Sequence, residues 1–324
     1  MSAQLLGVDV GGTKVSVGAL QDGSFEGPHV FATEKGGADG LIDQIVAGVE
    51  ELRGPEAAAV GVAVPSIIEF ATGRVRSSVN VPLQDVPLRS VLEERLGLPT
   101  FVDNDATVAA LAEAHDGDRL IYSDLVMLTV GTGVGGGLVL NGRLYRGATG
   151  AAAELGHTLI GLDLADGVPE PAGWPQPGSL ESLASGFRAL DPLAAKIAAE
   201  HPDSALGRLA AEGREVKGPD LVAAANEGDE PARGGLSLLG ERLGIGIANA
   251  VNTFDPQVVV IGGGVAQGAG ELLLEPARRV ARGYILPGVG DNLEIVQARY
   301  GNDAGVRGAA LMAGQELAAR EMAA

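Results

Sequence analysis

Cysteine is absent from this 324-residue chain, which excludes disulfides and thiolate metal sites and fits a reducing compartment. Aromatic residues are scarce at 3%, with a single tryptophan. Basic residues are in the minority, 23 against 42 acidic ones, and the formal net charge is −19. A surface of that sign repels phosphate backbones and anionic lipid headgroups, so nucleic acid and membranes are not expected as partners.

The chain also lacks any apolar run that approaches the ~18 residues of a membrane-spanning helix. Its first residues, Met1 to Gln4, do not begin a basic region followed by an apolar core, as a secretory leader would. We therefore expect a soluble, cytoplasmic protein. Glycine, by contrast, is abundant. The 50 glycines have no every-third-residue period, which excludes collagen, and the mean hydropathy of +0.19 argues against general disorder.

The order of the expected elements is that of an α/β protein. Three strands form a meander, helices and strands then alternate, and a similar order begins again near Asp124. Hairpin turns are expected at Asp22-Gly23 and Asn141-Gly142, and residues 166–178, with four prolines, are expected to be loop. The expected strands span 5–10, 15–20, 28–33, 57–64, 100–102, 125–130, 137–140, 143–145 and 257–261. The expected helices span 41–52, 86–96, one that opens at 103–105 and runs through 114, one ending near 252, and 303–320.

The segment Asp9-Val10-Gly11-Gly12-Thr13-Lys14 lies between two of these strands. Glycines without a Cβ let backbone N–H groups approach phosphates closely, and a threonine hydroxyl and a lysine add further donors. Asp9 could hold a divalent cation directly or through water. A plain type I′ hairpin turn is the alternative, and no helix follows, so this is not a Walker loop.

A second segment of this kind, Gly131-Thr132-Gly133-Val134-Gly135-Gly136-Gly137, is expected to form a turn between two later strands. A lone glycine run is weak evidence for a ligand site. Two loops of glycine and threonine, each at a strand junction of a repeated meander, together predict a site for one phosphate chain.

Asp103-Asn104-Asp105 opens a predicted helix. Asp and Asn are the preferred residues for capping a helix N-terminus, but one of the three is enough for that purpose. A remaining carboxylate at this position is a candidate general base for a sugar hydroxyl. Its pKa need not be high, because positioning matters more than proton abstraction in phosphoryl transfer.

Glu154-Leu155-Gly156-His157 contains one of the four histidines. With Glu181, this glutamate and histidine could bind neighbouring hydroxyls of a pyranose. A surface histidine, or one satisfied within the core, is the alternative.

These motifs and Ile261-Gly262-Gly263-Gly264 occur in the order and spacing of the ROK family of sugar kinases, and the chain most resembles their bacterial glucokinases. The resemblance covers about residues 5–160 and 235–315. It implies an α/β fold of the two-lobed, actin-like ATPase (ribonuclease H-like) type. The smaller lobe would comprise residues 1–118 and 303–324, and the larger one residues 119–302.

The resemblance also implies roles. Asp105 would take the proton of the sugar 6-hydroxyl as that oxygen attacks the γ-phosphate of ATP, which yields glucose 6-phosphate from glucose. The sugar would be held by Asn80, Asn104, Asp105, Glu154, His157 and Glu181. The phosphates and Mg²⁺ would lie among Asp9, Gly11, Gly12, Thr13, Lys14, Thr132 and Gly133, with Asp9 holding Mg²⁺ through water, and the adenosine would lie near Gly262, Gly263 and Gly264. A homodimer is also implied.

The sequence departs from the family pattern in two places. Many members bind zinc through the histidine of the Glu-x-Gly-His motif and three cysteines, whereas here Ser179-Leu180-Glu181 and Trp174 occupy the corresponding segment. We expect no zinc site, and we expect Trp174 and the prolines to stiffen this loop instead. Ser66 stands where the family usually has glycine, on the sugar side.

Other substrates and another class of function stay open. Mannose, fructose or an N-acetylhexosamine could be the acceptor, and polyphosphate the donor. A non-catalytic sugar sensor is disfavoured because Asp105 and both glycine loops are intact, and because the eight residues before Asp9 leave no room for a DNA-binding domain.

Overall fold

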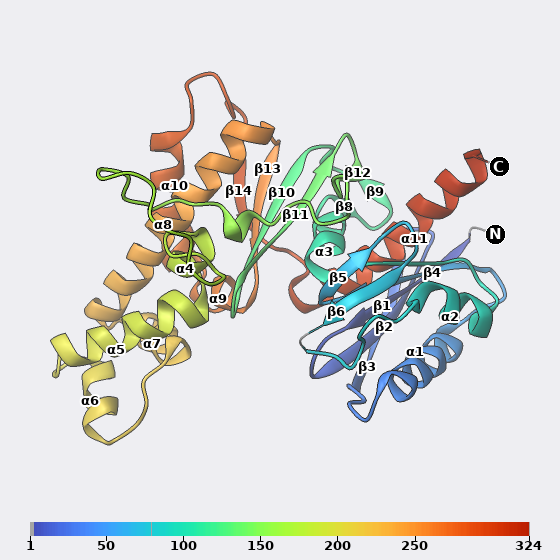
Figure 1. The fold of residues 1–324 in the computed structure, drawn as a ribbon, viewed down its shortest axis with the longest axis horizontal. Helices are drawn as coiled ribbons and strands as arrows, with labels where there is room; N and C mark the ends of the chain where they lie inside the picture. The colour runs from blue at the N-terminus through green and yellow to red at the C-terminus, as the bar shows by residue number, and fades with distance from the viewer. Residues whose placement is uncertain (1–2, 79, 324) are drawn as a thin grey trace. The chain divides into compact units, whose positions relative to one another are not determined.

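The computed structural model describes residues 3–78 and 80–323, which form an α/β protein (Figure 1). Contacts group the chain into two compact units: Met1–Leu125 with Gly137–Ala153 and Arg299–Ala324, and Val126–Gly136 with Glu154–Ala298. Each unit is described by itself. No helix within the described ranges combines the length and apolar character needed to cross a lipid bilayer.

A five-stranded sheet of order β3-β2-β1-β4-β7 forms the centre of the first unit. β1 pairs antiparallel with β2, and β4 is parallel to both β1 and β7. The expected turn between β2 and β3 is confirmed, since Asp22 and Gly23 both have positive φ, at 52° and 72°. The strands span Gln4–Val10 (β1), Lys14–Gln21 (β2), Ser24–Ala32 (β3), Ala57–Val64 (β4) and Thr100–Asn104 (β7).

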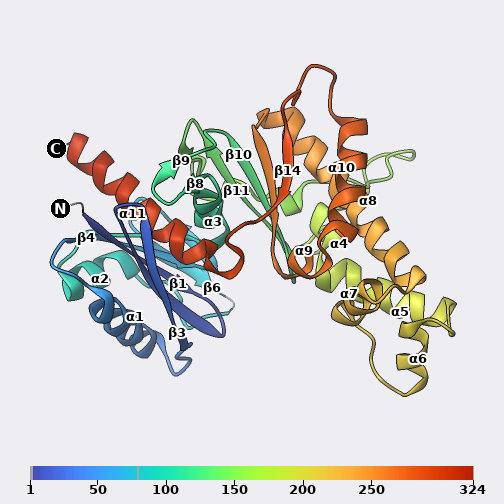
Figure 2. The ribbon, with the colours of Figure 1, turned by 180° about the vertical axis from the view of Figure 1, so that it is seen from behind.

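The alternation of residues along β1 separates two faces of this sheet. Leu6, Val8 and Val10 are buried in a cluster with residues of α1 (Ala38–Leu52) and α2 (Leu88–Leu96). Gly7 faces α11 (Ala304–Ala323) instead, and a β-carbon there would overlap the carbonyl oxygen of Val306. Figure 2 shows α11 from its own side of the sheet. Asp9 therefore faces α11 and not the apolar cluster.

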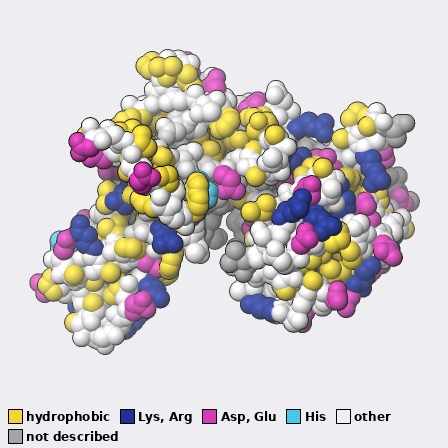
Figure 3. Space-filling model, in the orientation of Figure 1, with side chains coloured by type: hydrophobic (Ala, Val, Ile, Leu, Met, Phe, Trp, Pro, Cys, Tyr) yellow, Lys and Arg dark blue, Asp and Glu magenta, His cyan; other side chains and the backbone are white. Residues whose placement is uncertain are grey.

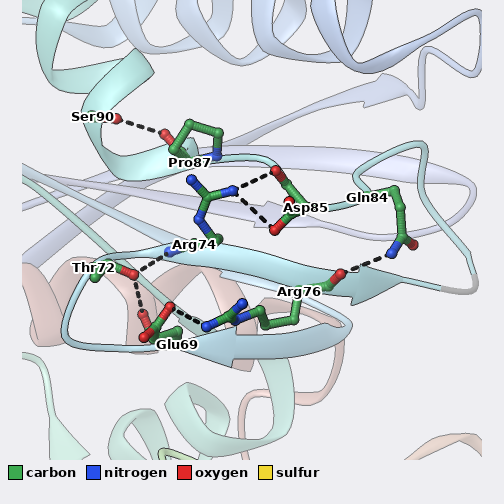
Figure 4. A network of polar contacts seen from close by, with 8 residues as sticks. All are labelled: Glu69, Thr72, Arg74, Arg76, Gln84, Asp85, Pro87 and Ser90. Atoms are coloured by element: carbon green, nitrogen blue, oxygen red, sulfur yellow. Dashed lines mark hydrogen bonds and ion pairs between the residues drawn. The ribbon is translucent and has the colours of Figure 1, made fainter.

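Two elements after β4 bring polar residues to the end of the sheet. α3 (Asp105–Glu113) follows β7 directly. β5 (Ser66–Glu69) and β6 (Arg74–Ser78) form a hairpin that the sequence pattern does not predict. Side-chain contacts hold it, with Arg76 Nη2 2.9 Å from Glu69 Oε2 and Arg74 Nη1 2.9 Å from Asp85 Oδ1 (Figure 4). β6 ends two residues before Asn80. A second small hairpin pairs β8 (His115–Asp116) with β9 (Arg119–Leu120).

A second sheet has the order β12-β11-β10-β13-β14, and the boundary between the units runs through β10 and β11. β11 begins at Val134, so the prediction of a turn over 131–137 is wrong in its second half. The hairpin turn at Asn141-Gly142 is confirmed by φ values of 53° and 73°. The strands are β10 (Leu125–Val130), β11 (Val134–Leu140), β12 (Arg143–Leu144), β13 (Val258–Gly262) and β14 (Glu294–Gln297).

Helices make up most of the rest of the second unit. α8 (Glu230–Phe254) packs closely on α10 (Glu271–Tyr284), because Gly240 and Gly244 leave room for backbone carbonyls of α10. Residues 166–178 contain no helix or strand, which confirms the expected loop. The shorter helices are η1 (Leu155–His157), α4 (Leu180–Ala184), η2 (Gly186–Leu190), α5 (Asp191–Glu200), α6 (Ala205–Ala211), α7 (Gly218–Asn226) and α9 (Gly264–Ala269), with η3 (Gly301–Asp303) in the first unit.

Candidate functional site

The turn between β1 and β2 does not have the geometry of a type I′ hairpin. That turn needs positive φ at both central residues, whereas Gly11, Gly12 and Thr13 lie outside the left-handed region. The Gly11 N–H donates to the Lys14 carbonyl at 2.8 Å. A β-carbon on Gly12 would lie 3.2 Å from both the Cβ and the carbonyl oxygen of Asn80. The structure thus brings Asn80 against the glycine turn, and close approach explains the glycine.

Asp9, at the end of β1, has an unusual carboxyl group. Burial and the nearby charge of Asp105 raise its pKa to about 7, although Lys14 opposes this shift. Gly305 of α11 lies against the carboxylate, and a β-carbon there would come 2.5 Å from Asp9 Oδ2. Two neighbouring carboxyl groups with only one nearby lysine favour the approach of a further cation.

The three polar residues between β7 and α3 have different partners. Asn104 caps α3, since its Oδ1 accepts from the N–H groups of Ala106 at 3.0 Å and Thr107 at 3.2 Å. Its Nδ2 lies 3.4 Å from the Ser66 carbonyl oxygen. Asp103 is buried and pairs with Arg146. The capping alternative therefore describes Asn104 and leaves Asp105 unexplained.

Asp105 is the first residue of α3, and its carboxylate has no side-chain hydrogen-bond partner among the described residues. It accepts from the Ala106 N–H at 2.9 Å. Burial raises its pKa, and hydrogen bonds from backbone N–H groups oppose that rise. An accessible oxygen with increased basicity can accept a proton from a bound hydroxyl group.

Sequence reasoning missed Arg146. Its Nε lies 2.6 Å from Asp103 Oδ2 and its Nη1 2.9 Å from Glu316 Oε1, and its guanidinium carbon lies 3.6 Å from the centre of the Phe70 ring. Arg146 thereby fixes the residue just before the cap of α3. Arg146 and Asp103 are 43 residues apart in the sequence, and no local pattern indicates the pair.

In the second unit, the first half of the glycine-rich segment is a turn held by its neighbours. The Gly131 carbonyl accepts from the Gly186 N–H at 2.7 Å, and the Thr132 carbonyl accepts from the Phe187 N–H at 3.2 Å. Glu181 Oε2 accepts from the Val134 N–H at 2.8 Å, and its carboxylate lies directly against Gly133. Glu181, predicted to bind sugar, is thus placed on the predicted phosphate loop.

Glu154 and His157 lie together, with His157 Nε2 3.7 Å from Glu154 Oε2. Gly156 seats this motif on β11, because a β-carbon there would overlap the Val134 carbonyl oxygen. His157 is one-third exposed, and its Nδ1 has no hydrogen-bond partner among the residues that the structure describes, so it is not a histidine satisfied within a core. Its ring meets that of Trp174 edge-to-face, with centroids 5.2 Å apart and planes at 85°.

Gly262, Gly263 and Gly264 join β13 to α9. Gly263 has φ 88°, and a β-carbon there would overlap the Val130 carbonyl, so only glycine fits this position. Nothing lies within 4 Å of a β-carbon built on Gly264. The end of β13 therefore offers accessible backbone close to β10.

The residues present bear differently on the two metals considered, Mg²⁺ and zinc. Asp9 supplies a carboxylate, and Mg²⁺ in nucleotide sites commonly needs only one or two carboxylates beside phosphate and water oxygens. Within residues 3–78 and 80–323, no three or more His, Cys, Asp or Glu side chains gather so as to hold a metal ion.

The predicted site residues thus form two groups, one in each unit, and the roles assigned to them stay predictions. The first group comprises Asp9, Gly11, Gly12, Thr13, Lys14, Asn80, Asn104 and Asp105. The second comprises Thr132, Gly133, Glu154, His157, Glu181, Gly262, Gly263 and Gly264.

Comparison with known proteins adds independent evidence. The profile of the ROK family matches residues 5–316. A glucokinase of Halalkalibacterium halodurans is 34% identical over 322 residues, covering 96% of this chain and 95% of that protein. An N-acetyl-D-glucosamine kinase of Vibrio vulnificus is 33% identical over 319 residues, covering 94% and 98%.

Solved structures of ROK proteins are also similar to this chain. A ROK family glucokinase of Streptomyces griseus, in complex with glucose and AMPPNP, is 32% identical with a TM-score of 0.75, covering 97% of this chain and 100% of that one. A ROK hexokinase of Thermus thermophilus is 34% identical, also with a TM-score of 0.75, covering 98% and 99%.

Proposed function

This chain belongs to the ROK family, and from that premise we propose that it transfers the γ-phosphoryl group of ATP to the 6-hydroxyl of glucose. The enzyme is a sugar kinase with the actin-like α/β fold expected from the resemblance. One observation carries the assignment of its base: of the three polar residues at the start of α3, Asp105 alone has a carboxylate without a capping or ion-pair function.

On the acceptor side, Asp105 takes the proton of the attacking hydroxyl. The raised pKa makes its carboxylate a better proton acceptor, and its fixed place at the helix start orients the hydroxyl oxygen. Asn80, Asn104, Glu154, His157 and Glu181 bind the remaining sugar hydroxyls. Asn104 Oδ1 already accepts two N–H groups in capping α3. Asn104 therefore binds the sugar with its remaining hydrogen-bonding capacity.

On the donor side, two glycine-containing turns supply backbone N–H groups to the phosphates. Gly11, Gly12, Thr13, Lys14, Thr132 and Gly133 contribute to phosphate binding, while Gly262, Gly263 and Gly264 bind the adenosine. Asp9 would hold Mg²⁺, in keeping with its raised pKa beside Asp105. Bound there, Mg²⁺ would neutralise charge on the transferring phosphate.

Glucose is favoured as acceptor because glucokinases match almost the full length of the chain. A specific observation keeps N-acetylglucosamine as the second candidate: the Vibrio vulnificus kinase named for that sugar matches at nearly the same identity. Polyphosphate is the alternative donor.

Initial rates of phosphate transfer test the proposal. Glucose, mannose, fructose and N-acetylglucosamine are each offered with ATP and with polyphosphate, in the presence and absence of Mg²⁺. The expected result is the highest kcat/KM for glucose with ATP and Mg²⁺. A higher kcat/KM for another hexose would identify that hexose as the acceptor in place of glucose. If phosphate is transferred to none of the four sugars, the proposed kinase activity is wrong. The homodimer and the cytoplasmic location stay predictions. Light scattering in solution tests the homodimer.

A further inference from the structure

We propose that Trp174 is a positioning residue for His157, and that an edge-to-face ring contact orients this imidazole for binding the hexose without a metal ion. The inference rests on the proposed role of His157 as a sugar ligand. It goes further by naming a residue that acts through His157.

The contact between the two rings has a well-defined geometry. The centroids lie 5.2 Å apart and the planes meet at 85°, as in favourable T-shaped aromatic pairs. Trp174 is 70% exposed, so burial of its own surface does not account for its position. An exposed indole held against one particular side chain indicates a function connected with that side chain.

No hydrogen bond described around His157 fixes the orientation of its ring. Its Nδ1 is buried without a hydrogen-bond partner, and the 3.7 Å from Nε2 to Glu154 exceeds hydrogen-bond length. The backbone is held, since the His157 N–H donates to the Glu154 carbonyl at 3.0 Å. Packing rather than hydrogen bonding therefore orients the imidazole, and the indole supplies a ring contact of defined geometry.

The loop that carries Trp174 is itself anchored. At its base, the Ile160 N–H donates to the Gly178 carbonyl at 2.8 Å and the Leu180 N–H to the Thr158 carbonyl at 2.8 Å. Next to Trp174, the Gln176 side chain accepts from the Ala172 N–H at 2.8 Å and donates to the Ala172 carbonyl at 2.7 Å. These bonds brace the backbone on both sides of the indole.

The surroundings of His157 do not fit the zinc ion that the family pattern would imply. The indole that faces the imidazole has no lone pair to offer a metal, and Ser179 accepts from the Ser182 N–H at 3.2 Å to cap α4. No cluster of three metal-binding side chains occurs among the described residues. His157 thus has an aromatic contact and no set of metal ligands among the described residues.

The test compares Trp174→Ala and Trp174→Phe with wild type. The control is Tyr284→Ala, which removes a similarly exposed aromatic ring of the same unit. Trp174→Ala should weaken glucose binding about three- to tenfold, with kcat and the KM for ATP nearly unchanged. Trp174→Phe should restore most of the affinity, and Tyr284→Ala should leave it unaltered. Calorimetry measures glucose affinity independently of turnover.

Fluorescence adds a readout that general loosening of the fold would not give. Trp174 is the only tryptophan, so all indole emission comes from this position and responds to changes around it. Glucose should change the emission of wild type and not that of His157→Gln, provided that circular dichroism shows His157→Gln to be folded. Unchanged glucose affinity in Trp174→Ala, or stoichiometric zinc whose removal weakens glucose binding, would overturn the inference. If wild type neither binds nor phosphorylates a hexose, the proposed function fails instead.

Discussion

At the residue scale, the start of α3 separates three tasks among three neighbouring side chains. Asp103 is buried and neutralised by Arg146, Asn104 satisfies the helix end, and Asp105 keeps an accessible oxygen. A neutral cap matters here, because a third carboxylate at position 104 would repel Asp105 and add to the repulsion that Asp9 already experiences. The side chain at each of the three positions is therefore suited to the group that it contacts.

Replacing Asp105 by Asn should abolish most of the turnover while hexose binding persists. The amide oxygen can still accept from the Ala106 N–H, but the side chain no longer takes up a proton. Loss of general-base catalysis typically costs about 10²- to 10⁴-fold in kcat. Initial rates and calorimetry with glucose measure the two quantities. Asp39→Asn, the same change in the first turn of α1, should leave both unaltered, and near-normal turnover in Asp105→Asn would remove this residue from the mechanism.

The pKa of Asp9 predicts a dependence of stability on pH. Its pKa rises from 3.8 to about 7 on folding, so the folded state binds the proton more tightly than the unfolded state. The resulting stabilisation is complete below pH 3.8 and is lost as the pH rises through about 7, by up to about 4 kcal/mol. Asp9→Asn mimics the protonated form and should be more stable than wild type at pH 8, but not at pH 4.

Urea unfolding at both pH values, with a chelator present, measures this difference. Adding Mg²⁺ and nucleotide at pH 8 should stabilise wild type more than Asp9→Asn, because a cation favours the ionised carboxylate. Parallel pH profiles for the two proteins would contradict the assignment.

At the scale of elements, local patterns predict the regular parts of the fold. β1, β4 and β13 are short apolar runs that end at glycine or proline, and the Asp22-Gly23 and Asn141-Gly142 turns contain residues that tolerate positive φ. The β5–β6 hairpin was missed because its side-chain contacts join residues 7 and 11 positions apart, which no local pattern expresses. β11 starts earlier than predicted, at Val134, whose N–H donates to Glu181, 47 residues away.

The same difference between local patterns and long-range contacts applies to the candidate site. Motif residues such as Asp105 and Gly263 could be found because chemistry or backbone geometry restricts their identity. Arg146 and Gly305 could not, since each acts through a tertiary contact far along the chain. Even within a motif, the partners of Asn104 and Glu181 depend on packing that no local pattern expresses.

Arg146 links three elements, so its loss should affect the whole first unit. It contacts Asp103 of β7, Glu316 of α11 and the Phe70 ring after β5. Arg146→Met leaves a buried carboxylate unpaired and should lower the free energy of unfolding by about 3–5 kcal/mol, measured in urea. Arg74→Met, which removes an exposed pair with Asp85, should cost less than about 1 kcal/mol.

A double variant separates charge from packing. Adding Asp103→Asn to Arg146→Met removes the uncompensated charge and should recover part of the lost stability. If the double variant is no more stable than Arg146→Met alone, the contact with Phe70 is the more important part of the interaction.

At the scale of the whole molecule, the net charge is −19. Acidic and basic side chains intermingle on the face drawn in Figure 3, with no single acidic region that dominates it. An acidic protein that binds ATP needs local compensation at the phosphates. The backbone N–H groups of the glycine turns, Lys14 and Mg²⁺ supply it in the proposed mechanism.

Self-repulsion of this charge should make stability depend on salt. At low ionic strength the excess carboxylates repel one another across the folded surface, and at 0.1 M salt the screening length shortens to about 10 Å. The urea midpoint at pH 8 should therefore rise between 10 and 150 mM NaCl. At pH 5.5, closer to the sequence pI of about 4.5, the net charge is smaller and the rise should shrink. A midpoint that falls with salt at pH 8 would show that exposed ion pairs such as Arg95–Asp43 contribute more than the net repulsion costs.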